Sequence, residues 1–163
     1  MGTAQIREKH DGALHGQMEV RVWLRLLSCS TVIEKRLRRR FVEQYDTTLP
    51  RFDVLATLAR FPNGVTMGEL SRALLVSNGN TTSLARQLEA DGLVSSRPAP
   101  EDKRSSIVTL TKKGRRHFEK LAAAHRNWIE NMFTAMSPDD QHILFELLAT
   151  LKRSIAADED DTE

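Results

Sequence analysis

The sequence predicts a mainly α-helical protein with a small β-wing, and three observations support this fold class. Apolar residues recur at spacings of three and four along most of the chain, the period of helices that bury one face. Two short helical segments, 67–74 and 77–91, are joined by a tight turn. Two strand-like segments, 93–97 and 106–110, then flank a charged hairpin. This order predicts a winged helix-turn-helix, a shape that can place one helix in the major groove of DNA.

Two further helices are expected before the helix-turn-helix. The first spans residues 20–44, about 25 residues, and is too long to bury its whole apolar stripe against so small a body. Its apolar positions are Trp23, Leu26, Leu27, Ile33, Leu37 and Phe41. The second begins at Leu49-Pro50, because proline is tolerated in the first turn of a helix, and ends near the turn residues 62–64.

The two helices of the helix-turn-helix carry local start and stop signals. Thr66 and Glu69 fit a capping box for the first helix. Ser77 is the expected cap of the second helix, and Gly92 is expected to end it. On a helical wheel, one face of the second helix is suited to packing and carries Thr81, Leu84, Ala85 and Leu88.

The opposite face of this second helix suits contact with base edges. Asn and Gln can bond adenine, Arg prefers guanine, and the methyl group of Thr can contact that of thymine. Gly79 costs about 1 kcal/mol relative to Ala inside a helix, which a close approach to DNA would justify. An ordinary solvated face is the alternative. The candidate base-reading residues are Ser77, Asn78, Gly79, Asn80, Thr82, Ser83, Arg86 and Gln87.

The hairpin carries the most specific motif in the chain. Asp102, Lys103 and Arg104 stand at its tip, and the strand 107–111 closes on Leu-Thr. This segment resembles the wing of the MarR family of bacterial transcription regulators, and the resemblance extends over roughly residues 23–155. It implies that Arg104 enters the minor groove while Asp102 braces it, and Lys103 stands where many members have another arginine. A surface salt bridge is the alternative for this pair.

Other basic residues are candidates for phosphate contacts, which require charge rather than strict geometry. They are Arg72, Arg97, Lys112 and Lys113, with Arg115 and Arg116 close behind. The run from Lys35 to Arg40 is ambiguous. It could face DNA, line a ligand pocket, pair with acidic groups across a dimer, or form a solvated helix face.

Two apolar helices are expected after the wing. The first is capped by Thr111 or a neighbour and continues to about Met136; the second has Ser137 as its cap and Pro138 as its first residue. The stripe of the last helix is Ile143, Leu144, Leu147, Leu148, Leu151 and Ile155. Because this stripe would be exposed in a monomer, a homodimer formed by both ends of the chain is expected, with two recognition helices about 34 Å apart on a pseudo-palindromic operator.

The expected domain limits follow from these elements. They are a flexible N-terminal extension (1–18), a dimerisation helix (19–48), a DNA-binding domain (49–111), C-terminal helices that complete the dimerisation domain (112–157) and an acidic disordered tail (158–163).

The family resemblance also implies a regulatory ligand and a mode of action. Many members bind a small aromatic or acidic molecule between the dimerisation helices and the winged domain, and most act as repressors. Candidate pocket residues are Trp23, Arg51, His125 and Trp128. An architectural DNA-binding protein without an effector is the alternative function.

Composition restricts the remaining classes. Five of the 22 acidic residues lie in the last six positions, so without that tail Lys and Arg outnumber Asp and Glu by seven, which favours a polyanionic partner. No metal-ligand pair, nucleotide loop or nucleophile motif is present, so neither an enzyme nor a cofactor is expected. The sequence shows neither a membrane span nor a secretory signal, and a cytoplasmic location is expected. The single cysteine, Cys29, is interpreted as a buried packing residue, with a redox-sensing role as the alternative.

Overall fold

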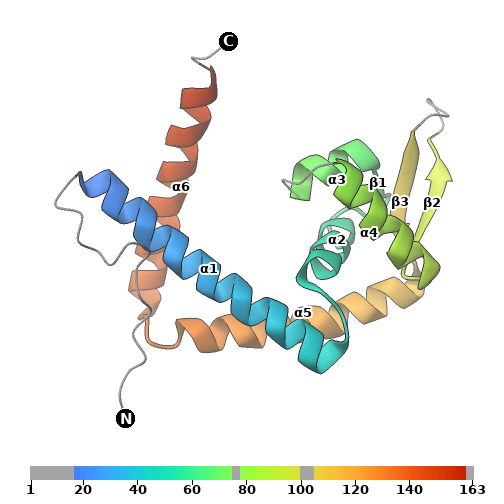
Figure 1. Cartoon of the computed structure of the whole chain (residues 1–163), viewed down its shortest axis with the longest axis horizontal. Coiled ribbons are helices and arrows are strands. Elements are labelled where there is room, and N and C mark those ends of the chain that lie inside the picture. The colour runs from blue at the N-terminus through green and yellow to red at the C-terminus, as the bar shows by residue number, and fades with distance from the viewer. Residues whose placement is uncertain (1–16, 75–77, 100–104, 161–163) are drawn as a thin grey trace. The chain divides into compact units, whose positions relative to one another are not determined.

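The computed structural model describes residues 17–74, 78–99 and 105–160. They form two compact units that divide in the chain after Arg126. The elements confirm the predicted fold class, a mainly helical protein with a small antiparallel sheet (Figure 1). In chain order they are α1 (Met18–Tyr45), α2 (Leu49–Ala59), β1 (Val65–Thr66), α3 (Met67–Leu74), α4 (Asn78–Ala90), β2 (Val94–Pro98), β3 (Ser106–Leu110), α5 (Lys112–Phe133) and α6 (Pro138–Asp160).

Helices α2 and α3 begin where their caps require. The Thr48 hydroxyl accepts from the N–H of Arg51 at 3.4 Å, and Pro50 occupies the first turn of α2. At α3, the N–H of Thr66 donates to the Glu69 carboxylate at 2.7 Å, and the N–H of Glu69 donates to the Thr66 hydroxyl at 3.2 Å. This reciprocal pair is the predicted capping box. The hydrogen bonds from Thr66 also lower the pKa of Glu69.

Helix α4 ends at the predicted glycine. Gly92 has a φ of +69°, in the left-handed region that a glycine adopts without a Cβ clash. Its N–H donates to the Glu89 carbonyl at 2.9 Å, and the N–H of Leu93 donates to the Leu88 carbonyl at 2.9 Å. These bonds satisfy carbonyls at the end of the helix and turn the chain directly into β2.

The sheet has the strand order β1-β3-β2, and both pairings are antiparallel. Val108 in β3 stands opposite Val65 in β1 and opposite Ser96 in β2. Gly64, with a φ of +84°, precedes β1, and a Cβ added there would lie 2.6 Å from the Val108 carbonyl oxygen. A side chain at this position would therefore prevent β1 from lying against β3.

The core of the first unit is formed by α2, α3, α4 and the sheet, together with Phe41 of α1 and Leu121 of α5. The inward residues of α2 and α4 are buried there, except for Leu84, which is half-buried, because these short helices each present one apolar stripe to the same interior. The most completely buried side chains include Leu55, Leu58, Leu70, Thr81, Leu88, Val94 and Val108.

Helix α5 starts close against the end of α4. The Thr111 hydroxyl accepts from the N–H of Gly114 at 2.9 Å, as expected of a cap, and donates to the Gly92 carbonyl at 2.8 Å. A Cβ on Gly114 would lie 1.8 Å from the Leu93 carbonyl oxygen. Only glycine therefore permits this approach of the α5 backbone to the segment that joins α4 to β2.

In the second unit, α6 has the predicted cap, because the Ser137 hydroxyl accepts from the N–H of Asp140 at 3.1 Å. The helix continues to Asp160, beyond the limit that we expected at residue 157. Ala156 and Ala157 favour helix, and neither glycine nor proline interrupts residues 156–160. Among the described residues, no helix combines the length and the apolar composition needed to cross a bilayer.

The prediction that Cys29 is buried is wrong. Its side chain is exposed on α1, whereas Leu24 and Ser28 are buried. These two residues lie one turn apart and occupy the inward side of the helix at this point. The next residue is rotated by about 100°, which turns Cys29 toward solvent.

Candidate nucleic-acid interface

Helix α4 has one buried face and one exposed polar face, as predicted. Thr81, Ala85 and Leu88 are buried, with exposed fractions of 0%, 4% and 0%. On the other face Thr82 is half-buried, and the exposed residues are Gly79, Asn80, Ser83, Arg86 and Gln87. Ser77 lies outside the described residues, and of Asn78 only the helical backbone is described. The exposed set provides amide, hydroxyl and guanidinium groups, the donors and acceptors that read base edges.

Packing against the described residues does not require glycine at position 79. Among those residues, a Cβ added there would meet no heavy atom within 4 Å. The surface around Gly79 is therefore open to another molecule, as a close approach of DNA to the α4 backbone would require.

The base of the wing is fixed to the recognition helix. The N–H of Ser96 in β2 donates to the Glu89 carboxylate of α4 at 2.8 Å. The hydroxyls of Ser95 and Thr109 pair across the two strands at 3.1 Å. The tip residues Asp102, Lys103 and Arg104 lie outside the described residues.

The candidate phosphate contacts differ in their surroundings. Arg72, Arg97 and Lys112 are exposed on α3, β2 and α5. Lys112 also lines a hollow of about 380 Å³ with Arg115 and Arg116. Lys113 is used within the chain, because its Nζ donates to the main-chain carbonyl of Asp91 at 2.7 Å. Its neighbour Lys112 is thus better placed than Lys113 to meet a phosphate.

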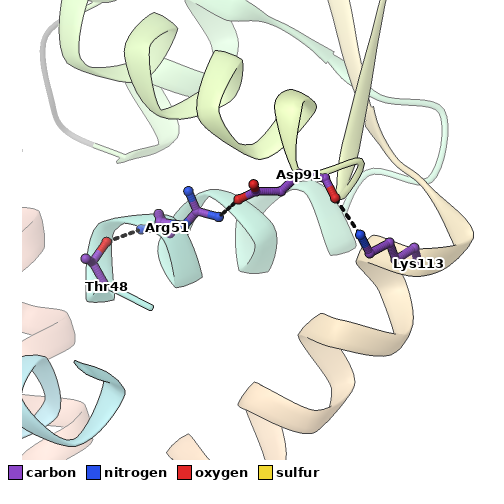
Figure 2. Close-up of polar contacts among 4 residues, drawn as sticks. All are labelled: Thr48, Arg51, Asp91 and Lys113. Atoms are coloured by element: carbon purple, nitrogen blue, oxygen red, sulfur yellow. Dashed lines mark hydrogen bonds and ion pairs between the residues drawn. The ribbon is translucent and has the colours of Figure 1, made fainter. Parts of the chain in front are cut away.

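A polar linkage holds the end of α4, and sequence reasoning missed it. The Arg51 guanidinium of α2 donates to the Asp91 carboxylate, and Lys113 of α5 bonds the carbonyl of the same residue (Figure 2). The Arg51 side chain is 18% exposed and that of Asp91 is 53% exposed. A local sequence pattern does not predict the contact between Arg51 and Asp91, because these residues are 40 positions apart.

This linkage borders a cavity of about 440 Å³, lined by the end of α1, the start of α2, the end of α4 and the start of α5. His117 lines it too. Burial chiefly lowers the pKa of His117, and the positive charges of Arg51, Lys120 and Lys113 add to this effect, whereas Asp91 opposes it. The residues that line this cavity are Tyr45, Asp46, Thr47, Arg51, Ala90, Asp91, Leu93, Lys113 and His117.

The other candidate effector residues lie elsewhere. His125 stacks on Phe52 and Phe41, with ring centroids 4.8 Å and 6.2 Å apart, and burial lowers its pKa. Trp23 is 55% exposed on α1, and Trp128 is buried in the second unit. Neither His125 nor Trp23 lines the cavity beside Arg51. His125 belongs instead to an aromatic cluster with Phe41 and Phe52.

Part of the basic run on α1 is a solvated face. Arg38 pairs with Glu34, and Arg39 lies 3.9 Å from Glu43; all four side chains are at least half exposed. Lys35 and Arg36 are also exposed. These are pairs within one helix, which contribute little to stability.

Known proteins resemble this chain in sequence and structure. The profile of the MarR family matches residues 45–105. The transcriptional activatory protein BadR of Rhodopseudomonas palustris is 35% identical over 159 residues, which cover 92% of this chain and 90% of that protein. The crystal structure of a MarR family transcriptional regulator from Silicibacter pomeroyi is 31% identical, has a TM-score of 0.72, and covers 84% of this chain and 94% of that one.

A structure with bound DNA has the same fold. It is Sco3205, a MarR family regulator from Streptomyces coelicolor, with a TM-score of 0.74 and 22% identity over 82% of this chain and 84% of that one. Its likeness concerns the fold, whereas the two more similar proteins establish the family. The chain belongs to the MarR family of winged helix-turn-helix proteins, which are DNA-binding transcription regulators and not enzymes.

Proposed function

We propose that the protein acts in the cytoplasm as a homodimer that binds a pseudo-palindromic operator, with α4 in the major groove. The division of α4 into a buried apolar face and an exposed polar face carries this proposal. Asn80, Arg86 and Gln87 read base edges, and the small side chains around Gly79 allow close approach. Arg72, Arg97 and Lys112 bind phosphates, which positions α4 without adding sequence information.

The wing contributes through Arg104, inserted into the adjacent minor groove and braced by Asp102, with Lys103 beside them. The described part of the wing supports this role, because the N–H of Ser96 in β2 donates to Glu89 of α4 and β2 pairs with β3. A narrow A·T-rich minor groove has an enhanced negative potential, which attracts an arginine.

The homodimer is supported by the apolar surface of α6. Ile143, Leu147 and Ile155 are 57%, 63% and 56% exposed in the single chain. Large apolar side chains gathered on one helix mark an interaction surface. A second copy of the chain covers them, and the twofold axis that relates the copies also relates the two halves of the operator.

A small aromatic or acidic effector changes operator affinity. The cavity beside Arg51 supports this proposal, since it combines cationic groups with the ring of Tyr45 next to the end of α4. An effector releases DNA by binding more tightly to a conformation that cannot bind the operator. Repression is the proposed output. Activation is the second candidate, favoured by the name of the relative from Rhodopseudomonas palustris, a transcriptional activatory protein.

The test is selection of bound fragments from random double-stranded DNA by the purified protein at two salt concentrations. The expected result is enrichment of an inverted repeat whose half-sites lie about 10 base pairs apart. Uniform, salt-sensitive retention without a motif would reject the operator proposal and favour an architectural role. A reporter placed downstream of the selected operator then distinguishes repression from activation.

A further inference from the structure

The residue that follows α4 contacts two other elements at the same time. The Asp91 carboxylate accepts a hydrogen bond from the Arg51 guanidinium of α2 (Figure 2). The main-chain carbonyl of Asp91 accepts a second bond, from Lys113 Nζ of α5, at 2.7 Å. Arg51 is itself held at the start of α2, where its N–H donates to Thr48. The end of the recognition helix is therefore fixed by directional bonds from both sides.

We propose that Asp91, held by Arg51 and Lys113, is a positioning residue that sets the orientation of α4 and thereby its preference among bases. This inference rests on the proposed sequence-specific binding. It assigns to these three residues no contact with DNA, and it gives Arg51 and Lys113 a role in addition to lining the proposed effector cavity.

The packing of the inward face of α4 explains why directional bonds at its end matter. Its inward face consists of Thr81, Leu84, Ala85 and Leu88, and apolar packing is not directional. Hydrogen bonds have narrow limits of distance and angle, so the bonds at Asp91, together with the bond from the N–H of Ser96 to Glu89, restrict small rotations and shifts of the helix.

Asp91 is also close to the base-reading side chains. Arg86 and Gln87 precede it by little more than one helical turn, a rise of about 6–8 Å. Base recognition depends on heavy-atom distances within a few tenths of an ångström. A small shift of the α4 end therefore changes the fit of Arg86 and Gln87 to base edges while leaving nearby phosphate contacts largely in place.

Burial separates this role from direct DNA binding. The Arg51 side chain is only 18% exposed and its charge is directed to Asp91. Asp91 is 53% exposed, so solvent screens the pair and its contribution to stability is small. Loss of the pair should consequently change base discrimination more than it changes the melting temperature.

The experiment compares the full-length protein with the variants Asp91→Asn, Arg51→Gln and Lys113→Met, and with the Arg51→Gln/Asp91→Asn double variant. Glu43→Gln is the matched control, because it removes a carboxylate from the surface pair with Arg39. For each protein, affinity is measured for the selected operator and for operators with single base changes, at two salt concentrations. Melting temperature is measured in parallel.

The expected result is a loss of discrimination between the operator and its base-substituted forms, by roughly fivefold or more in the Asp91 and Arg51 variants. The double variant should lose no more than either single variant, since both remove one interaction. The salt slope should stay at the wild-type value, because no phosphate contact is lost. The Glu43→Gln control should retain full discrimination.

Two results would overturn the proposal. Unchanged discrimination with a lower melting temperature would make the linkage a stabilising contact only. A flatter salt slope in the Arg51 or Lys113 variants would show that these cations bind phosphate directly. If the wild-type protein itself does not discriminate among sequences, the proposed operator function fails first, and this inference fails with it.

Discussion

Helices α4 and α6 follow the same amphipathic rule but satisfy it differently. In α4, Leu88 is fully buried within its own chain. In α6, Leu147 is 63% exposed, although it stands in an equally regular apolar stripe. Both helices have apolar residues at helical spacing, so the pattern alone does not say what covers them.

The two apolar stripes contribute to different free energies, that of folding for α4 and that of association for α6. The apolar face of α4 contributes to folding of the single chain, because its surroundings are α2, α3 and the sheet. The apolar face of α6 is exposed in the single chain, so it contributes little to folding. We propose that its burial contributes to the free energy of association with a second copy. Substitutions in the two stripes should therefore affect different measurements.

The largest effect is expected from Leu147→Glu. In the proposed dimer each copy loses about 1.5–3 kcal/mol of apolar burial, so two copies lose about 3–6 kcal/mol of association free energy. Sedimentation should show monomers at concentrations where the wild-type protein is a dimer, while the helical content remains. His142→Glu, at an exposed polar position of α6, is the control and should remain dimeric. A dimer that survives Leu147→Glu would place the interface elsewhere.

The matching change in α4, Leu88→Ala, should act on folding. Removal of a fully buried leucine side chain is expected to lower the free energy of unfolding by about 2–5 kcal/mol. Urea unfolding measures this loss, and Leu147→Ala in a dissociated protein should cost far less. Equal losses at the two positions in the monomer would contradict the distinction between the stripes.

The outward face of α4 should respond in DNA binding alone. Arg86→Ala is expected to weaken binding to the selected operator by about 1–3 kcal/mol and to relax the preference at one base position. Lys112→Ala serves as the comparison, since it should weaken all sequences alike and lower the salt slope by about one. Titrations of labelled operator and of a scrambled duplex distinguish the two. A uniform loss for Arg86→Ala would make it a phosphate contact.

The smallest effect concerns Asp53 on α2, whose carboxyl group is half-buried. Burial raises its pKa from 3.8 to about 6, with Arg38 lowering it and Glu34 raising it in smaller amounts. Because the folded state holds this proton more tightly than the unfolded state, stability should fall as pH rises from about 4 to about 6. Asp53→Asn should remove this decline and stabilise the protein above pH 6, by about 1 kcal/mol or less because solvent screens the half-exposed group. Urea unfolding at both ends of the range measures it, and destabilisation at neutral pH would show that the ionised carboxylate is favourable.

The sequence predicted the elements of the helix-turn-helix because their signals act over a few residues. The reciprocal bonds of Thr66 and Glu69 and the left-handed Gly92 involve neighbours within one turn. The division of α4 into inward and outward faces follows from its helical period. These features depend on local sterics and hydrogen bonding, which the order of residues already specifies.

Tertiary structure alone decided how distant residues meet. The sequence suggests Arg51 as an effector contact and Lys113 as a phosphate contact, yet both bond Asp91, for which the sequence predicts only the end of a helix. Cys29 was expected to be buried and is exposed, because the rotation of α1 about its axis is set by packing. The spacing of apolar residues shows that a helix has two different faces. Which neighbours each face contacts depends on how the fold brings together segments that are tens of residues apart in the sequence.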